Sequence, residues 1–253
     1  VPPLACQREL KGLYVRHRHA NAVREQALRE ILKAYASAGI DTLVLKGAAL
    51  AYLVYSQPGL RPMRDTDLLV AESDVHTAQH ILGDLGYDIS PDPGNPLSHQ
   101  HHHLDIARRY DQGLRVSIEV HFRLFPRTIY YPSIFLEDLM DQAVSFQVGD
   151  MTAHTLGYEV MLWHVYRHAC GPPLLRTPLR FMHLADMVGL IDKFYDRMDW
   201  KKVKRHYPQV IHILPLLNCL SPWRPQLRQR FSLNAETSPQ GVGRDYQGWP
   251  RRR

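Results

Sequence analysis

The stretch KGAALAYLVYSQPGLRPMRDTDLLV, residues 46–70, decides how the fold is interpreted. It begins as a glycine turn entering a helix, is interrupted at SQPG, crosses two arginines and ends on an apolar run that carries carboxylates. A short apolar run bounded by turn residues predicts a buried strand, where ionised side chains are costly unless something neutralises them. Any hypothesis about function therefore has to account for the carboxylates of Asp65 and Asp67.

Composition limits the classes of protein to consider. The chain has 253 residues, of which 45% are hydrophobic, so it can bury a core in one large domain or two modest ones. The formal net charge of +6 favours anionic partners such as nucleotides. Cys6, Cys170 and Cys219 lie too far apart to suggest a disulfide framework or a cysteine zinc site, which favours a cytoplasmic protein. No apolar run is long enough for a membrane span.

The first half of the chain alternates helices and strands. Apolar residues recur at helical spacing through 20–38, and Gly39 follows as a stop signal. Glycine, proline and capping residues divide the segment that follows. The expected elements are a strand at 41–47, a helix at 48–55, a strand at 66–70, and a helix at 73–87 capped by Ser73 or Asp74 and closed by Gly86.

Two extended segments, 101–110 and 114–124, come next, joined by Asp-Gln-Gly, a hairpin signal. The second segment alternates between an apolar and a polar face. The apolar face has Val116, Ile118, Val120, Phe122 and Leu124, and the polar face has Ser117, Glu119, His121 and Arg123. By itself this pattern is equally typical of a half-solvated antiparallel strand.

The second half is expected to be helical. Helical patterns cover 157–170, 179–194, 199–207 and 209–220, and the end is polar and rich in glycine and proline. The sequence therefore predicts an α+β protein. Its expected parts are an N-terminal helical segment at 1–39, a mixed core at 40–156, a helical domain at 157–233 and a disordered tail at 234–253.

The acidic pair suggests a metal site. If Asp65 and Asp67 both lie on a strand, their side chains leave the same face, close enough to share divalent cations. Bound Mg²⁺ would remove their mutual repulsion. Glu119, on the polar face of a later strand, is the third candidate ligand. Three such carboxylates can hold two ions, one activating the attacking oxygen and one holding a triphosphate.

The turn before the first short helix suggests a site for phosphate. Gly47 allows a sharp turn, so the backbone N–H groups of residues 47–49, including that of Ala48, can point at an anion from a helix N-terminus. Lys46, Arg61 and Arg64 add positive charge around the same unit. The ordinary alternative, a loop with surface basic residues, fits each of these residues taken singly.

These segments carry a family resemblance. LKGAALAYLVYSQPGLRPMRDTDLLV, then LGDLGYDI, HHHLDI and VSIEVHFRLF, resemble in order and spacing the uncharacterised nucleotidyltransferase family of the DNA polymerase beta-like superfamily. LWHVYRHA and FMHLADMVGLI are similar to its helical half, so the resemblance spans most of 40–205. It implies a polymerase-beta-like core followed by a helical C-terminal half. It also implies that Asp65, Asp67 and Glu119 are metal ligands and catalytic residues.

The activity implied is the transfer of a nucleotidyl group, AMP from ATP being favoured, to a hydroxyl acceptor with two Mg²⁺ ions, or Mn²⁺ in their place. Gly47-Ala48 stands where Gly-Ser or Gly-Gly is usual, and Glu119 where Asp is more common. Both departures keep a second hypothesis open, a catalytically degenerate nucleotide- or peptide-binding protein. The complete acidic triad favours the enzyme.

Histidines and basic runs suggest other functions less well. The tract at 99–103 has the composition of a metal site, but neighbouring residues of a strand face opposite ways. His164 and His168 have zinc-protease spacing, yet Val165 stands where the catalytic glutamate would be. The basic runs DWKKVKRHY and WPRRR lack interleaved aromatic residues for base stacking. A peptide, protein or small-molecule acceptor is therefore favoured over nucleic acid.

Overall fold

The computed structural model describes residues 3–89, 102–126, 133–170, 181–221 and 223–233. The chain divides into two compact units, residues 1–157 and 158–253. The predicted tail, 234–253, lies outside the described residues. In the ranges that the structure describes, no helix combines the length and apolar character needed to cross a membrane.

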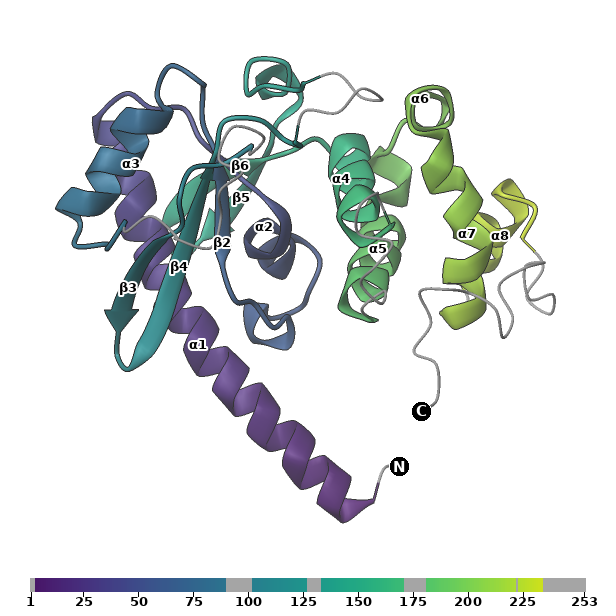
Figure 1. The fold of residues 1–253 in the computed structure, drawn as a ribbon. Helices are drawn as coiled ribbons and strands as arrows, with labels where there is room; N and C mark the ends of the chain where they lie inside the picture. The colour runs from purple at the N-terminus through teal and green to yellow at the C-terminus, as the bar shows by residue number, and fades with distance from the viewer. Residues whose placement is uncertain (1–2, 90–101, 127–132, 171–180, 222, 234–253) are drawn as a thin grey trace. The chain divides into compact units, whose positions relative to one another are not determined.

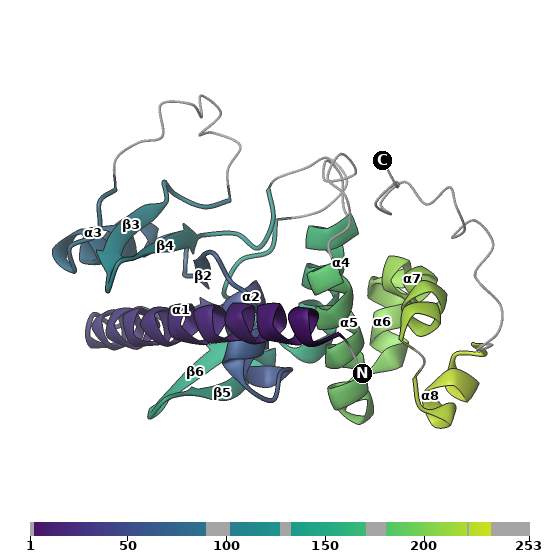
Figure 2. The same ribbon diagram turned by 90° about the horizontal axis from the view of Figure 1, so that it is seen from below.

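A mixed four-stranded sheet forms the centre of the first unit (Figure 1). Its strands follow the order β1 (Leu43–Val44), β2 (Thr66–Leu69), β4 (Leu114–His121) and β3 (Ala107–Asp111). β2 and β4 are parallel, and the two outer pairs are antiparallel. A separate antiparallel pair, β5 (Val144–Val148) and β6 (Met151–Thr155), forms a second sheet (Figure 2). The predicted α+β class with a mixed sheet is confirmed.

The predicted hairpin joins β3 to β4 through two residues. Gln112 and Gly113 have φ of 48° and 76°, and positive φ at both positions is the signature of a tight turn that matches the twist of the strands. The predicted apolar face is also correct within β4, because Val116, Ile118 and Val120 are completely buried. β4 ends at His121, so the predicted strand extends too far.

Helices pack around this sheet. α1 (Leu4–Ser37) and α3 (Val75–Asp84) contact each other and β4, whereas α2 (Lys46–Leu53) contacts β2 and β5. The short 3-10 turn η1 (Pro58–Leu60) packs against α1 and α2. The glycines expected after the first and third helices have φ of 74° at position 39 and 83° at position 86, the left-handed conformation of a helix end.

Two helix starts differ from the predictions. α1 begins at Leu4 rather than near residue 20, because its first turns are made of good helix formers but are mostly exposed and so lack the apolar periodicity of a buried face. α2 begins at Lys46 rather than at residue 48, and β1 is correspondingly short. Lys46 and Gly47 therefore belong to the helix that follows the strand.

The second unit is helical, as predicted. α4 (Tyr158–Cys170), α5 (Phe181–Phe194), α6 (Trp200–His206) and α7 (Pro208–Leu220) match the four predicted segments, and α8 (Pro225–Arg230) was not predicted. The side chain of Asp199 caps α6 by accepting hydrogen bonds from the backbone N–H groups of Lys201 and Lys202. His164 is buried and His168 is exposed.

Candidate active site

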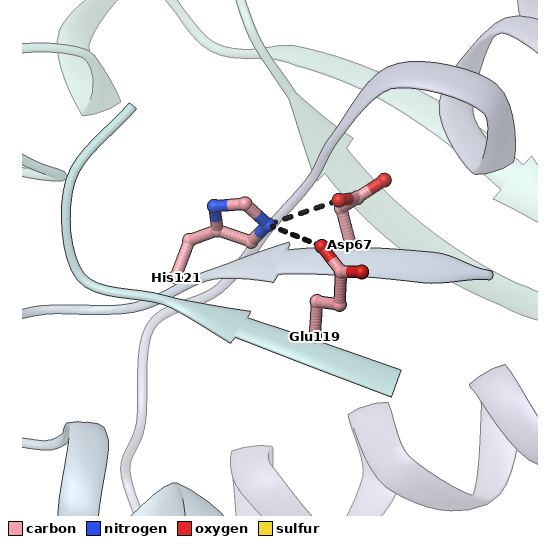
Figure 3. Close-up of side chains that lie close together, drawn as sticks. All are labelled: Asp67, Glu119 and His121. Atoms are coloured by element: carbon pink, nitrogen blue, oxygen red, sulfur yellow. Dashed lines mark hydrogen bonds and ion pairs between the residues drawn. The ribbon is translucent and has the colours of Figure 1, made fainter. Parts of the chain in front are cut away.

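The register of β2 and β4 brings two acidic side chains together. Asp67 and Glu119 are direct partners across this parallel pair. Side chains at paired positions leave the same face of a sheet, so both carboxylates lie side by side (Figure 3). Asp67 is buried and Glu119 is half-buried.

His121 completes this group. It lies two residues after Glu119 on β4 and is fully buried. Its Nε2 lies 2.9 Å from Oδ1 of Asp67 and 3.5 Å from Oε2 of Glu119 (Figure 3). One ligand atom from each of the three residues lies within 4.8 Å of the other two. His121 is on the predicted polar face with Glu119, but no role was predicted for it.

Asp65 lies beside this group but outside it. β2 begins at Thr66, close to its predicted start, so Asp65 precedes the strand and only Asp67 meets the condition that its side chain leaves from the strand. The residue as a whole is exposed, yet partial burial of its carboxyl group and the charges of Asp67 and Glu119 raise its pKa. Asp65 thus interacts electrostatically with the pair, and its part as a metal ligand stays a prediction.

Lys46 reaches into the same group from the start of α2. Its Nζ lies 2.6 Å from Oδ1 of Asp67. Burial alone would raise the pKa of Asp67, but the charge of Lys46 and the hydrogen bond from His121 hold that pKa well below its usual range. Both donors use Oδ1, so a cation that bound Asp67 through this oxygen would have to displace them.

The physical reason for a glycine at position 47 differs from the predicted one, which was a sharp backbone turn. It is absent from the glycines with positive φ, whereas its neighbour Lys46 has a φ of 46°. The guanidinium group of Arg61 covers Gly47 so closely that a Cβ there would lie 3.0 Å from Cζ of Arg61. A glycine at position 47 therefore lets the buried Arg61 approach the N-terminus of α2.

Helix α1 holds the segment that carries Arg61. The side chain of Asn21 donates hydrogen bonds to the carbonyl oxygens of Pro58 and Arg61, at 2.7 and 2.8 Å. A Cβ at Gly59 would lie 3.0 Å from Cα of Arg18, so η1 sits directly against the helix backbone. Asn21 was not predicted as part of the site, because a single asparagine on a helix belongs to no motif.

The two other residues predicted to contact phosphate differ in their burial. Ala48 is buried, so its methyl group belongs to the core. Arg64 is exposed next to Asp65. The structure thus brings Lys46, Gly47 and Arg61 together at the start of α2, while binding of nucleotide by any of these five residues stays a prediction.

Two histidines of the predicted tract pack against His121. The ring centroids of His102 and His103 lie 4.8 and 5.2 Å from that of His121, and an isolated bridge pairs His103 with His121. The expected alternation of neighbouring side chains is therefore absent at these two residues. Burial, with the neighbouring imidazoles, lowers the pKa of His102 to about 2, so this ring is neutral at pH 7.

A family model described as uncharacterised nucleotidyltransferase matches residues 1–211. The chain belongs to this family. Its fold is similar to that of an antigenic nucleotidyltransferase-like protein from Paracoccidioides brasiliensis, with a TM-score of 0.53 at 12% identity over 87% of this chain and 96% of that one. This likeness shows that the family member has a nucleotidyltransferase fold, as the resemblance implied.

The antibiotic-resistance factor ANT(2'')-Ia gives weaker likenesses. Its solution structure has a TM-score of 0.47 at 12% identity over 83% of this chain and 94% of that one. Its crystal structure with adenylyl-2''-tobramycin has a TM-score of 0.45 at 13% identity over 66% and 87%. Among curated proteins, nothing matches this chain.

Proposed function

We propose that this protein transfers a nucleotidyl group from a nucleoside triphosphate, with ATP favoured, to a hydroxyl acceptor in a Mg²⁺-dependent reaction. The observation that carries the proposal is the pairing of Asp67 with Glu119 in a family of nucleotidyltransferases. An apolar pair at these two positions would stabilise the sheet more than two carboxylates do, because each ionised group loses hydration on burial.

The side chains of this group fit a divalent cation. Asp67, Glu119 and His121 offer two carboxylates and one imidazole within 4.8 Å, and Asp65 adds negative charge nearby. Carboxylate oxygens are the ligands that Mg²⁺ and Mn²⁺ favour, and imidazole also suits transition metals. Mg²⁺ would be held by Asp67 and Glu119 with Asp65, and when bound it supplies positive charge that polarises the triphosphate and the attacking hydroxyl.

The residues of the chain would bind and orient the substrates. The triphosphate would be held by Arg61, Lys46 and the N–H groups at the start of α2, because a helix N-terminus and two basic side chains favour an anion. The acceptor oxygen would form a bond to the α-phosphorus as the bond from that phosphorus to the bridging oxygen breaks and pyrophosphate leaves. Glu119, less buried than Asp67, would accept the proton of the hydroxyl.

The acceptor is proposed to be a peptide, a protein or a small molecule rather than nucleic acid. The test measures Mg²⁺-dependent pyrophosphate release from ATP with hydroxyl-bearing candidates of each class, together with Mn²⁺ binding by electron paramagnetic resonance. Asp67→Asn should abolish both, whereas Asp84→Asn, at an exposed carboxylate on α3, should change neither. Asp67-dependent binding of Mn²⁺ and ATP with no release for any acceptor would favour the degenerate binding protein.

A further inference from the structure

Lys46 has an unusual backbone at the start of α2. Its φ of 46° is in the left-handed region, which residues other than glycine, asparagine and aspartate rarely adopt. Such strain persists only where surrounding contacts impose it, and it is concentrated at functional sites. At this position the contact that accompanies the strain is the ion pair with Asp67.

The ammonium group of Lys46 lies where a metal ion would find its ligands. Nζ is 2.6 Å from Oδ1 of Asp67, and the same oxygen accepts a hydrogen bond from His121 at 2.9 Å. Burial lowers the pKa of Lys46, but the charges of Asp67, Glu119 and Asp65 outweigh it and raise that pKa. One ammonium thus offsets the repulsion among three carboxylates.

We propose that the ammonium group of Lys46 neutralises these carboxylates in the metal-free protein and moves from Asp67 to the triphosphate when a metal–nucleotide complex binds. This inference rests on the proposed function. A divalent cation on Asp67 repels an ammonium group beside it, and the flexible four-carbon side chain lets the group leave. The proposed phosphate site is the start of α2, where Lys46 itself lies and Arg61 covers Gly47. A triphosphate bound there would be the nearest new anion for the ammonium group.

Metal and nucleotide should consequently bind cooperatively. Metal alone has to displace Lys46 from Asp67, whereas metal with nucleotide gives the ammonium group a new anion. By thermodynamic linkage, each ligand then strengthens the binding of the other by the same factor. A lysine that only bound phosphate would leave the affinity for metal alone unchanged on its removal.

The experiment uses the full chain with Mn²⁺ alone, Mg²⁺ alone, and ATP with Mg²⁺ as probes. Lys46→Met should bind Mn²⁺ alone about tenfold more tightly than the wild type and ATP with Mg²⁺ about tenfold less tightly, a change of about 1.4 kcal/mol in each case. Lys46→Arg keeps the charge and should resemble the wild type in its affinity for Mn²⁺. Lys33→Met, at an exposed lysine of α1, is the matched control and should change neither affinity. Unchanged or weaker Mn²⁺ binding by folded Lys46→Met overturns the proposal.

A measurement on the wild type covers the case in which Lys46→Met does not fold. The ε-methylene NMR signal of Lys46, identified by its loss in Lys46→Arg, should shift with Mg²⁺ alone and shift again with Mg²⁺ and ATP. A signal that ignores Mg²⁺ overturns the proposal. Asp67→Asn distinguishes failure of the proposed function from failure of the inference about Lys46. If this variant still binds Mn²⁺, the proposed function is wrong. If it loses Mn²⁺ binding while the Lys46 experiments give negative results, only the inference about Lys46 is wrong.

Discussion

Asp67 and Glu119 face each other across the parallel pair of β2 and β4, and the ammonium group of Lys46 neutralises Asp67 from the start of α2. Asp65 is placed differently, since it precedes the strand and is exposed. Two aspartates separated by one residue therefore have opposite electrostatic environments, which lower the pKa of Asp67 and raise that of Asp65.

Replacing the two aspartates should change stability in opposite directions. Asp67→Asn leaves half-buried Lys46 without its ion-pair partner and should lower the free energy of unfolding by about 3 kcal/mol in the absence of metal. Asp65→Asn relieves repulsion from Asp67 and Glu119 and should raise the melting temperature slightly. Thermal and urea unfolding at pH 7 with a chelator present measure both. Equal effects of the two variants would show that the pair is electrostatically equivalent.

The acid dependence of stability should identify Asp67. Its pKa is lower in the folded than in the unfolded state, so its contribution is present above the reference value of 3.8 and is lost as the pH falls toward the lower folded pKa. The difference in unfolding free energy between wild type and Asp67→Asn should stay constant from about pH 7 to about pH 5 and shrink below about pH 4. A difference that shrinks between pH 7 and pH 5 would contradict the lowered pKa.

The length of the side chain at position 119 should matter for metal binding. Glu119→Asp shortens the carboxylate by one methylene beside a fixed partner on β2, and Glu119→Gln removes its charge. We expect both to weaken Mn²⁺ binding, Gln by more than about tenfold, because carboxylate charge dominates the affinity of such sites. Glu72→Gln, at an exposed ion pair with Arg123, is the control. Affinity unaffected by Glu119→Gln would remove Glu119 from the site.

Much of this arrangement could be predicted from the sequence, and the reason is local patterning. The hairpin at Gln112-Gly113, the glycine stops and the helical second half each follow from a short motif. The partnership of Asp67 with Lys46 could not be predicted, because it depends on where α2 begins and on its strained first residue. Mutual repulsion of the two aspartates would by itself make Asp67→Asn hold or raise stability, whereas the ion pair with Lys46 leads us to expect a loss.

The roles of His121 and Asn21 were also not predicted from the sequence, for two different reasons. His121 could have been found, since it shares the polar face of β4 with Glu119, but a histidine at that position is equally consistent with a packed core. Asn21 could not, because its hydrogen bonds to Pro58 and Arg61 join segments that are distant in the sequence. Tertiary contacts of this type leave no periodic signal.

The attachment of η1 to α1 should control nucleotide affinity through Arg61. Gly59→Ala would place a methyl group 3.0 Å from Cα of Arg18, a contact tight enough that η1 and α1 are expected to separate slightly. We expect this shift to pass to Arg61, which follows η1 directly, and to disturb its position over Gly47.

We therefore expect Gly59→Ala to weaken the binding of ATP with Mg²⁺ by about tenfold, measured by calorimetry, while binding of Mn²⁺ alone is unchanged. Gly12→Ala is the matched control, because a Cβ there meets no atom within 4 Å. It should leave ATP affinity unchanged and raise stability by about 0.5–1 kcal/mol through helix propensity. Asn21→Ala should weaken ATP binding in the same way as Gly59→Ala, since it removes the two hydrogen bonds that Asn21 makes to this segment. If both variants lose stability yet bind ATP as tightly as the wild type, η1 is purely structural and Arg61 does not contact the nucleotide.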